Sequence, residues 1–291
     1  MTESDQPLGR VLCSNDEYHA GPGISKSHLD AIAGRSPLHY WFKYVNPNRR
    51  PTPPTPEMQF GTAVHAAILE PDSFARQYLR TPEDAPPRPS SRQLLAKKPS
   101  IETLQAAEWW ADFDAKNAGK ILLGDAEYTT LIEMRDAAHS HPEIGPLLRS
   151  GFCEESFYAI DEETGELIKC RVDFRSPDWS YIIDLKTTRD ASDEGFGKSS
   201  AQFRYPLQPA WYYRVLRQAT GVRPQVWAFV AMEKEPPYAM GLYYVEDDVL
   251  ERAEIAAERD FQRIIECKRS GRFPDYATSP KPLILPQWAK L

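Results

Sequence analysis

Two acids and a lysine occur on neighbouring segments whose composition is typical of β-strands. Asp184 and Lys186 lie in the run IIDLKTT, and Asp173 is the next-to-last residue of the run LIKCRVDF, which precedes a short RSPDWS turn. Because strand side chains alternate between two faces, Asp184 and Lys186 point to one side and Leu185 to the other. The turn brings Asp173 beside the start of the next strand. Two carboxylates this close repel one another unless a cation lies between them.

Hard carboxylate oxygens select Mg²⁺ or Mn²⁺, and a site with one or two such ligands leaves room for water and for phosphate oxygens. The ion would polarise a phosphodiester and lower the pKa of a bound water. Lys186 would position or deprotonate the attacking water, or offset charge in the transition state. We therefore predict a Mg²⁺-dependent phosphodiester hydrolase with Asp173, Asp184 and Lys186 as catalytic residues.

A D-x-K pair alone also occurs on solvated sheet edges, as an ordinary alternating pair. The apolar residues before Asp184 instead favour a buried central strand, where an unpaired acid is costly and is usually functional. The second acid, Asp173, at the hairpin-linked position strengthens the interpretation as an active site.

These residues also carry a family resemblance. The segments GELIKCRVDF and YIIDLKTT resemble the G-x-x-x-x-R-x-D…D-x-K signature of RecB-like PD-(D/E)XK nucleases. Other segments are similar to the RecE-type (exonuclease VIII-like) branch and run through nearly the whole chain. The signature residues are Gly165 or Glu166, Arg171, Asp173, Asp184 and Lys186; the further segments are YHAGPGIS, SPLHYW, GTAVHAAILEP, EESFY, FRYPLQPAWYY and LPQWAK.

The resemblance implies additional site residues. His65 would be a metal ligand, although a lone histidine on an apolar helix is otherwise more often a core residue. Glu154 would supply the acid that precedes the first core strand, and the adjacent Glu155 is the alternative. The implied metal ligands are His65, Asp173, Asp184 and Leu185.

Gln208 and Tyr212 resemble a Q-x-x-x-Y element of the family and are implied to be part of the catalytic site. Their i, i+4 spacing places both on one helix face, turned toward DNA near the metal; the alternative is plain helix packing. Pro209 lies inside this element, and proline is accepted only in a helix's first turn. The helix should therefore begin near Leu207 or Gln208, a departure that bears on the role of Gln208.

The charge distribution offers phosphate contacts. The net charge of −7 disfavours indiscriminate coating of nucleic acid. The segments between Asp30 and Glu57 and between Asp84 and Glu102, however, contain basic residues and no acidic ones. They are either DNA contacts or solvated loops. Arg204 precedes a predicted helix start, where free N–H groups favour anions; it is otherwise an ordinary surface arginine. The predicted DNA contacts are Arg49, Arg50, Lys97, Lys98, Arg171 and Arg204.

The first half of the chain has mainly helical patterns. A short helix is expected within residues 24–44, with Ser25 and Ser27 as possible caps. A compact, mostly buried helix is expected over 58–69, and further helices over 101–117 and 125–139. Residues 80–93 lack apolar side chains and predict a mobile loop.

After residue 150 the pattern changes to short β-branched and aromatic runs. Residues 154–160, 166–174 and 180–188 predict a three-stranded antiparallel meander. A helix (207–219), two strands (225–233 and 240–246) and a long helix (247–269) should follow. The apolar face of the last helix should carry Leu250, Ile255, Phe261 and Ile264 or Ile265.

These elements predict an α/β fold of the PD-(D/E)XK type, with a central mixed sheet flanked by helices, an N-terminal helical region and a helical insertion. We expect a single nuclease domain over 1–291, mainly helical in 1–150, with an αβββαβ-type catalytic core and C-terminal helix in 151–291.

Composition excludes several other classes. No apolar run approaches the ~20 residues that a membrane helix needs, and the N-terminus MTESDQPLGR lacks the pattern of a secretory signal. The four cysteines are scattered, which argues against zinc, disulfide and iron–sulfur frameworks. A GxxxxGK[ST] motif is absent, so no ATP site is expected. We expect a cytoplasmic protein, bacterial or phage-encoded.

The resemblance implies an exonuclease that degrades linear double-stranded DNA from its ends, 5′ to 3′, and leaves 3′ single-stranded tails for recombination. It also implies a ring-shaped homo-oligomer such as a tetramer, and a partner of the RecT single-strand annealing type. The alternatives are a structure-selective or single-strand endonuclease, a non-catalytic DNA-end-binding scaffold, and a Mg²⁺ enzyme acting on small phosphate esters. Binding to a polymer should weaken steeply with salt.

Overall fold

The computed structural model describes residues 7–50, 53–277 and 279–285. The chain forms two compact units. We call the first the sheet unit; it comprises Met1–Pro53, Ser150–Ala231 and Gly241–Leu291. The second, the helical unit, comprises Pro54–Arg149 and Met232–Met240. One boundary between them falls at residue 150, where the sequence changes from helical to strand-like patterns.

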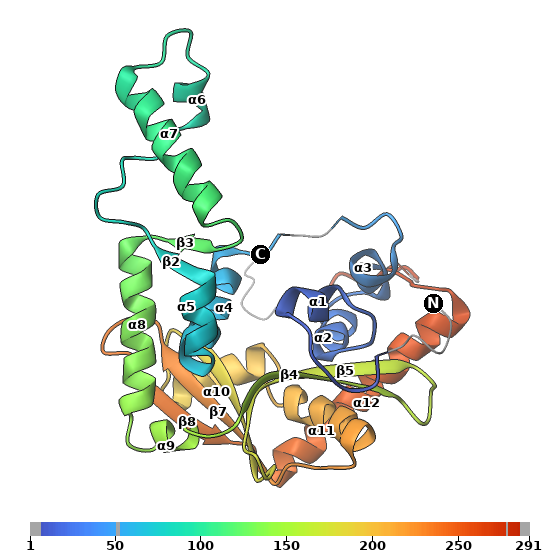
Figure 1. Ribbon diagram of the computed structural model, residues 1–291. Coiled ribbons are helices and arrows are strands. Elements are labelled where there is room, and N and C mark those ends of the chain that lie inside the picture. The colour runs from blue at the N-terminus through green and yellow to red at the C-terminus, as the bar shows by residue number, and fades with distance from the viewer. Residues whose placement is uncertain (1–6, 51–52, 278, 286–291) are drawn as a thin grey trace. The chain divides into compact units, whose positions relative to one another are not determined.

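A six-stranded sheet in the order β1-β4-β5-β6-β7-β8 is the central element of the fold (Figure 1). The predicted three-stranded meander is confirmed, because β4 pairs antiparallel with β5 and β5 pairs antiparallel with β6. The strand β1, which the sequence did not indicate, pairs antiparallel with the outer edge of β4. The strands are β1 (Gly9–Val11), β4 (Phe152–Ile160), β5 (Leu167–Arg175), β6 (Tyr181–Thr188), β7 (Val226–Glu233) and β8 (Met240–Tyr244).

The turns of the meander are closed by their own polar residues. In the β4–β5 turn, the Asp161 carboxylate accepts hydrogen bonds from the backbone and hydroxyl of Thr164 (3.0 and 2.7 Å). Gly165 follows with φ +73°, a backbone conformation that glycine adopts without a steric penalty. In the β5–β6 turn, Asp178 accepts from the backbone N–H of Ser180 at 3.0 Å. These local bonds fix where each strand begins and ends.

One face of the β4–β5 pair carries the main hydrophobic core. Helices α11 (Leu207–Thr220) and α12 (Asp247–Ser270) contribute to this core together with α2 (Lys26–Gly34). The Trp211 and Phe261 rings meet edge to face with centroids 5.1 Å apart, and burying each such side chain contributes about 1.5–3 kcal/mol. The strand residues on this face are Phe157, Ala159, Ile168, Cys170 and Val172.

The two helices predicted after the meander are present, but one residue of the predicted apolar face is exposed. Both α11 and α12 are confirmed within one residue of their predicted bounds. Ile255 was wrongly placed on the apolar face of α12, because its side chain is 66% exposed while Leu250, Ala253 and Ala257 are buried at helical spacing. The helix α10 (Asp193–Gln202) was not predicted; its two glycines and single buried apolar residue, Phe196, give little periodic signal.

The N-terminal region contains more breaks than predicted. The expected helix within 24–44 is α2, α3 (Pro37–Tyr40) and a π-helical turn, η2 (Trp41–Val45). Ser25 occupies the N-cap position of α2, whereas Ser27 lies inside the helix. The unpredicted helix α1 (Asn15–Ala20) begins with a capping box in which Ser14 and Glu17 bind each other's backbone N–H groups.

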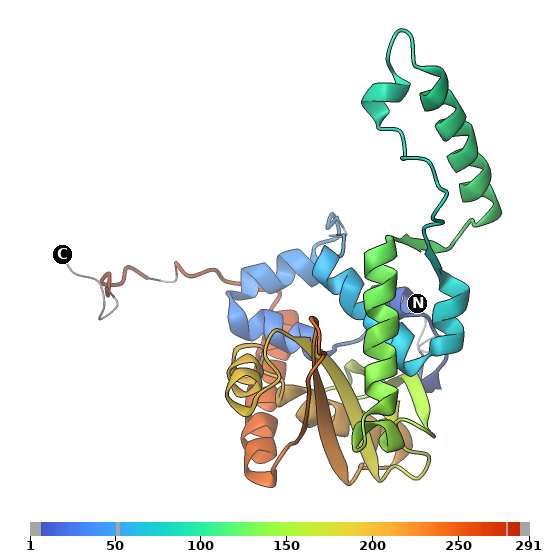
Figure 2. The ribbon, with the colours of Figure 1, turned by 90° about the vertical axis from the view of Figure 1, so that its left-hand side faces the viewer.

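The helical unit confirms the helices predicted over 58–69, 101–117 and 125–139 (Figure 2). Within it, the His139 ring lies 2.9 Å from the Ile68 carbonyl and links the unit's α4 and α8. The predicted loop at 80–93 contains the short helix α6. The elements are α4 (Pro56–Leu69), α5 (Pro71–Gln77), β2 (Tyr78–Arg80), α6 (Ser91–Leu94), α7 (Ile101–Lys116), β3 (Ile121–Leu123), α8 (Asp125–Ser140) and α9 (Ile144–Leu147).

Among the described residues, no helix combines the length and the apolar character that a membrane crossing needs. Of the family-like segment LPQWAK, only Leu285 belongs to the described residues, and the rest lies outside them.

A buried lysine joins α1 to the second face of the β4–β5 pair. Tyr18 packs there against Tyr158 and Leu167. Lys169, 2% exposed, donates to the carbonyls of Tyr18 (2.5 Å) and Gly21 (2.7 Å). Burial lowers the pKa of Lys169 to about 8, because removing the ammonium from water disfavours the charged form.

Lys169 should make stability depend on pH. Between about pH 8 and 10.5 the unfolded chain binds this proton and the folded chain does not, so stability rises with pH through that window. We expect the free energy of unfolding of wild type, relative to Lys169→Met, to increase by up to roughly 3 kcal/mol across the window. Chemical denaturation of both proteins at several pH values measures this. A difference that stays constant with pH would contradict it.

Candidate active site

The two predicted acids meet where the β5–β6 ladder ends. The paired residues are Phe174 with Ile183 and Arg175 with Ile182, so the next step of the same register sets Asp173 opposite Asp184. There Asp173 Oδ2 accepts a hydrogen bond from the backbone N–H of Leu185 at 3.0 Å. Because this bond ties the end of β5 to β6, the two carboxylates are held at one place.

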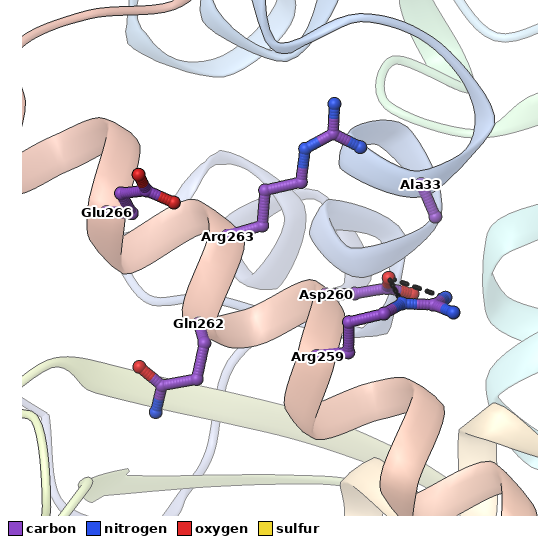
Figure 3. Close-up of a pocket in the computed structure, with 6 residues that line it drawn as sticks. All are labelled: Ala33, Arg259, Asp260, Gln262, Arg263 and Glu266. Atoms are coloured by element: carbon purple, nitrogen blue, oxygen red, sulfur yellow. Dashed lines mark hydrogen bonds and ion pairs between the residues drawn. The ribbon is translucent and has the colours of Figure 1, made fainter.

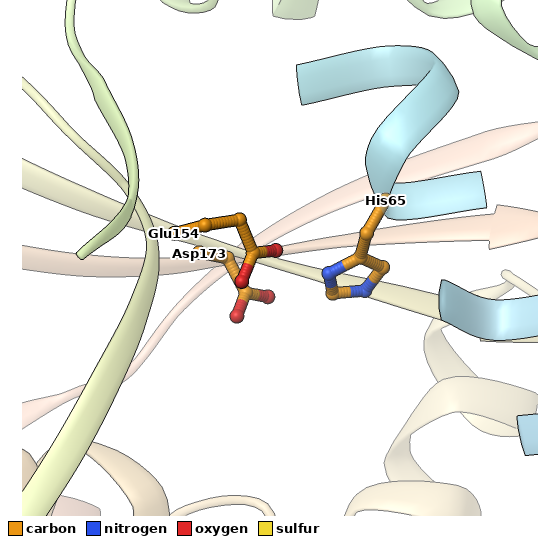
Figure 4. A group of neighbouring side chains, drawn as sticks. All are labelled: His65, Glu154 and Asp173. Atoms are coloured by element: carbon orange, nitrogen blue, oxygen red, sulfur yellow. The ribbon is translucent and has the colours of Figure 1, made fainter. Parts of the chain in front are cut away.

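A third acid comes from β4. Glu154 lies between the pairs Cys153–Phe174 and Glu155–Val172, which sets it opposite Asp173. Carboxylate oxygens of Glu154 and Asp173 lie within 4.8 Å of one another, and Figure 4 shows the two side chains turned toward each other. Glu154 has φ +51°, a left-handed conformation that costs a non-glycine residue roughly 1–2 kcal/mol. The rest of the structure must hold it there.

The neighbouring Glu155 is engaged elsewhere. It is 6% exposed and accepts from Arg175 Nε at 2.6 Å and from an Arg10 nitrogen at 2.8 Å. Of the two acids that the sequence left open, Glu154 is therefore the one placed beside Asp173.

Lys186 and Gln208 meet Asp184. The Lys186 ammonium forms an ion pair with Asp184 Oδ1 and donates to Gln208 Oε1 at 3.1 Å. The Gln208 amide nitrogen donates to Asp184 Oδ2. Gln208 occupies this position because α11 begins at Leu207, as predicted, which leaves Pro209 in the first turn where its missing N–H costs nothing. The proline does not move Gln208 away from the acids.

The charge state of Lys186 follows from its neighbours. Burial lowers the pKa of Lys186, but the carboxylates of Asp184 and Asp173 outweigh burial and hold this pKa above its ordinary value. Lys186 is therefore a cation here, and its ammonium also lies 5.2 Å from the Tyr205 ring centroid. As an ammonium, Lys186 is suited to stabilising negative charge. To remove a proton from water it would have to be a neutral amine, which would require a nearby cation to lower the pKa of Lys186.

Tyr212 lies one helical turn after Gln208 and is 8% exposed. Burial raises the pKa of Tyr212 well above its ordinary value, and the charges of Asp173 and Asp184 add to this effect. The hydroxyl therefore stays neutral and can donate a hydrogen bond. Its ring packs edge to face on Trp227, with centroids 5.4 Å apart, so packing and a site role coexist.

Sequence analysis missed two residues near the acids. Tyr205 precedes α11 and stacks on Phe203 while its ring faces the Lys186 ammonium. Lys26, at the start of α2, donates to the Phe203 carbonyl (3.0 Å) and pairs with Asp30 (2.8 Å). Burial lowers the pKa of Lys26. The charge of Lys186 lowers this pKa further, whereas Asp30 and Asp184 raise it. Tyr205 lies within the family-like segment FRYPLQPAWYY, which could have marked it, whereas Lys26 belongs to none of the family-like segments.

The predicted DNA contacts fall into two groups. Arg50, Lys97 and Lys98 are exposed, as is Arg49, which donates to the Tyr44 carbonyl. Arg171 instead faces inward and binds Glu154 at 2.8 Å.

Arg204 also faces inward. It is ion-paired with the buried Asp260 and, at 3.5 Å, with Asp30. Asp260 borders an open hollow of about 810 Å³ beside α12, where Arg259 holds it as well (Figure 3). The Asp260 carboxylate at this hollow is therefore already compensated by two arginines, Arg204 and Arg259.

His65 and Leu185 are the two predicted metal ligands that are not acids. His65 belongs to α4 of the helical unit, where it is half-buried while the adjacent Val64 is buried, so it is not a fully enclosed core histidine. The Leu185 side chain is 2% exposed, which leaves only its main chain to face a ligand. The metal roles of both residues stay predictions.

Acids and a lysine lie together where two neighbouring strands of the sheet diverge, and helices pack against this sheet. This arrangement defines the PD-(D/E)XK class of fold. The chain belongs to the family described as "PDDEXK-like domain of unknown function (DUF3799)", whose model matches residues 34–281. The predicted fold class and superfamily are thereby confirmed. The narrower resemblance to RecE-type exonucleases stays a prediction.

One solved structure shares the fold. A crystal structure from Eubacterium rectale, described as that of a "putative exonuclease", matches with a TM-score of 0.60 at 16% identity, over 94% of this chain and 97% of that chain. The crystal structure of SSO0001 matches with a TM-score of 0.27 at 18% identity, over 39% of this chain and 50% of that one. A search of the curated proteins finds no matching sequence.

The donor set fits a hard divalent cation. Glu154, Asp173 and Asp184 supply oxygen ligands of the kind that Mg²⁺ and Mn²⁺ prefer. The fully buried Asp184 Oδ1 has no hydrogen-bond partner among the described residues. It forms an ion pair with the Lys186 ammonium. Gathering acids in this way is costly without a cation.

Lys186→Met should make the fold depend more on metal. Removing one member of a buried ion pair should destabilise the protein by about 3 kcal/mol in the absence of divalent ions. Added Mg²⁺ should restore more stability to the variant than it adds to wild type, because binding to the folded state alone is stabilising. Thermal unfolding with and without Mg²⁺ measures this, and Asp184→Asn/Lys186→Met, which lacks a ligand, should respond less. Equal Mg²⁺ shifts in all three proteins would contradict the assignment.

Proposed function

We propose that this protein is a Mg²⁺-dependent exodeoxyribonuclease, also active with Mn²⁺, that degrades linear double-stranded DNA from its ends. The observation that carries the proposal is the single place shared by Asp173, Asp184 and Lys186. The fold family supports a nuclease, since its core is built to present this set. The arrangement is chemically complete for hydrolysis, because it combines oxygen ligands with a fixed cation that faces them.

Each residue has a distinct part in the proposed reaction. Glu154, Asp173 and Asp184 hold the metal, with the Leu185 main chain and His65 as further ligands. The chemistry that an ion held there would supply is polarisation of the scissile phosphate and a bound water of lowered pKa. The Lys186 ammonium offsets the negative charge that develops on the phosphate.

Two residues of α11 complete the proposed site. Gln208 bridges Lys186 and Asp184, so it keeps the ammonium and the carboxylate in a fixed arrangement. The Tyr212 hydroxyl, neutral at physiological pH, donates a hydrogen bond to the DNA backbone.

The finer features of the proposal rest on the resemblance to RecE-type exonucleases. They are 5′ to 3′ polarity, 3′ single-stranded products for recombination, a ring-shaped homo-oligomer and a RecT-type annealing partner. Arg49, Arg50, Lys97 and Lys98 are proposed as phosphate contacts because their side chains are exposed. For Arg171 and Arg204, whose guanidinium groups bind acids, a direct phosphate contact has less support.

The proposed activity predicts specific losses. Asp184→Asn and Lys186→Ala should each reduce Mg²⁺-dependent release of nucleotides from linear duplex by at least about 10³-fold, while DNA binding stays detectable. Lys198→Ala is a matched lysine control, because Lys198 is 74% exposed on α10. It should behave as wild type.

End-labelled linear DNA and covalently closed circular DNA, each with and without Mg²⁺, separate the alternatives. An exonuclease leaves the circle intact, and an endonuclease of the same fold cleaves it. Wild-type protein that binds DNA but cleaves neither the linear nor the circular substrate would favour a non-catalytic scaffold. Wild-type rates in either active-site variant would refute the assignment.

A further inference from the structure

The Glu154 carboxylate is held in place by a second residue. Glu154 has a backbone conformation that glutamate rarely adopts, with φ +51°, yet its carboxylate lies within 4.8 Å of the Asp173 carboxylate. A long, flexible side chain on a strained backbone does not stay in one orientation by itself. Some other group must fix the carboxylate.

Arg171 is that group by position and geometry. Its Nε donates to Glu154 Oε2 at 2.8 Å, and both side chains are largely buried, with 11% and 15% exposed. Arg171 lies two residues before Asp173 on β5, so strand alternation puts both on the same face. The charge-assisted bond is of the strong type, and it fixes the direction of the carboxylate plane.

The guanidinium is itself held by two further bonds. Its NH1 nitrogen donates to the Ser156 hydroxyl at 2.7 Å and to the Cys13 carbonyl at 3.0 Å. Ser156 faces Arg171 in the β4–β5 register, and Cys13 follows the edge strand β1. Three acceptors from β4 and the N-terminal segment thus engage three of the five N–H groups of the planar guanidinium, an arrangement that lysine cannot reproduce. With 11% of the side chain exposed and these three bonds made within the protein, the guanidinium is directed inward rather than toward solvent.

We propose that Arg171 is a positioning residue that orients Glu154 for metal binding, rather than a contact to DNA. This inference rests on the proposed metal-dependent function. It also gives the N-terminal segment a role, because the Cys13 carbonyl orients Arg171 and Arg171 orients Glu154. Arginine fits this role because it supplies charge compensation for the acids and direction at the same time.

The test measures Mn²⁺ affinity by isothermal titration calorimetry without DNA, in a double-mutant cycle of Arg171→Met and Glu154→Gln. Arg171→Met should weaken Mn²⁺ binding by about tenfold or more, the usual effect of removing a group that orients a ligand. In the Glu154→Gln background the same change should have almost no effect, because the two residues act through one carboxylate. Arg171→Lys should lie between wild type and Arg171→Met.

Controls separate positioning from general damage. Arg10→Gln removes an arginine that pairs with Glu155, and it should leave Mn²⁺ affinity unchanged. Thermal unfolding identifies any variant that fails to fold; if Arg171→Met does, Arg171→Lys replaces it in the cycle. Without divalent ions, DNA affinity and its salt dependence should be unchanged in Arg171→Met, whereas loss of a phosphate contact would reduce the salt slope by about one.

Several outcomes overturn the proposal. Equal losses of Mn²⁺ affinity in both Glu154 backgrounds would assign Arg171 a merely structural role. Unchanged Mn²⁺ affinity with weakened DNA binding would make it a phosphate contact. Wild-type protein that binds no Mn²⁺ would overturn this inference and the proposed function together. Wild-type protein that binds Mn²⁺ but cleaves no DNA would overturn the proposed function alone, and the cycle would still decide the role of Arg171.

Discussion

Mutual repulsion among clustered carboxylates is the constraint on which the rest of this structure depends. Three acids from three neighbouring strands, Glu154, Asp173 and Asp184, converge where the β5–β6 ladder ends. Such a cluster is unfavourable unless positive charge compensates it. The chain supplies part of this compensation through Lys186 on Asp184 and Arg171 on Glu154, and the oxygen-rich remainder suits a divalent ion.

Strand pairing and one short turn bring these acids and Lys186 together. Antiparallel pairing sets Glu154 and Asp173 opposite each other, and a short turn then returns the chain so that Asp184 and Lys186 follow on the next strand. The opposite face of β4 and β5 packs into an apolar core with α11 and α12. Since α11 starts at Leu207, its first turn delivers Gln208 to the acids. The stability of the core thus holds the acids at their positions.

Much of this was accessible from the sequence, because the signals were local. The meander, α11 and α12 follow from period-two and helical patterns, and D-x-K places two groups on one strand face. The choice between Glu154 and Glu155 was not accessible, since it depends on which arginine each acid meets across the sheet. The same holds for Arg171 and Arg204, whose partners Glu154 and Asp260 are distant in sequence. Ile255 shows the converse limit: an apolar residue just off the buried stripe remains exposed.

Anomalous diffraction from crystals grown with Mn²⁺ tests the central claim most directly. We expect one strong manganese peak, or two close together, coordinated by carboxylate oxygens of Asp173 and Asp184, with Glu154 contributing. Data from the Asp184→Asn variant should show a weaker peak or none. A manganese peak elsewhere on the molecule, with Asp173 and Asp184 bound to no ion in wild-type crystals, would contradict the account.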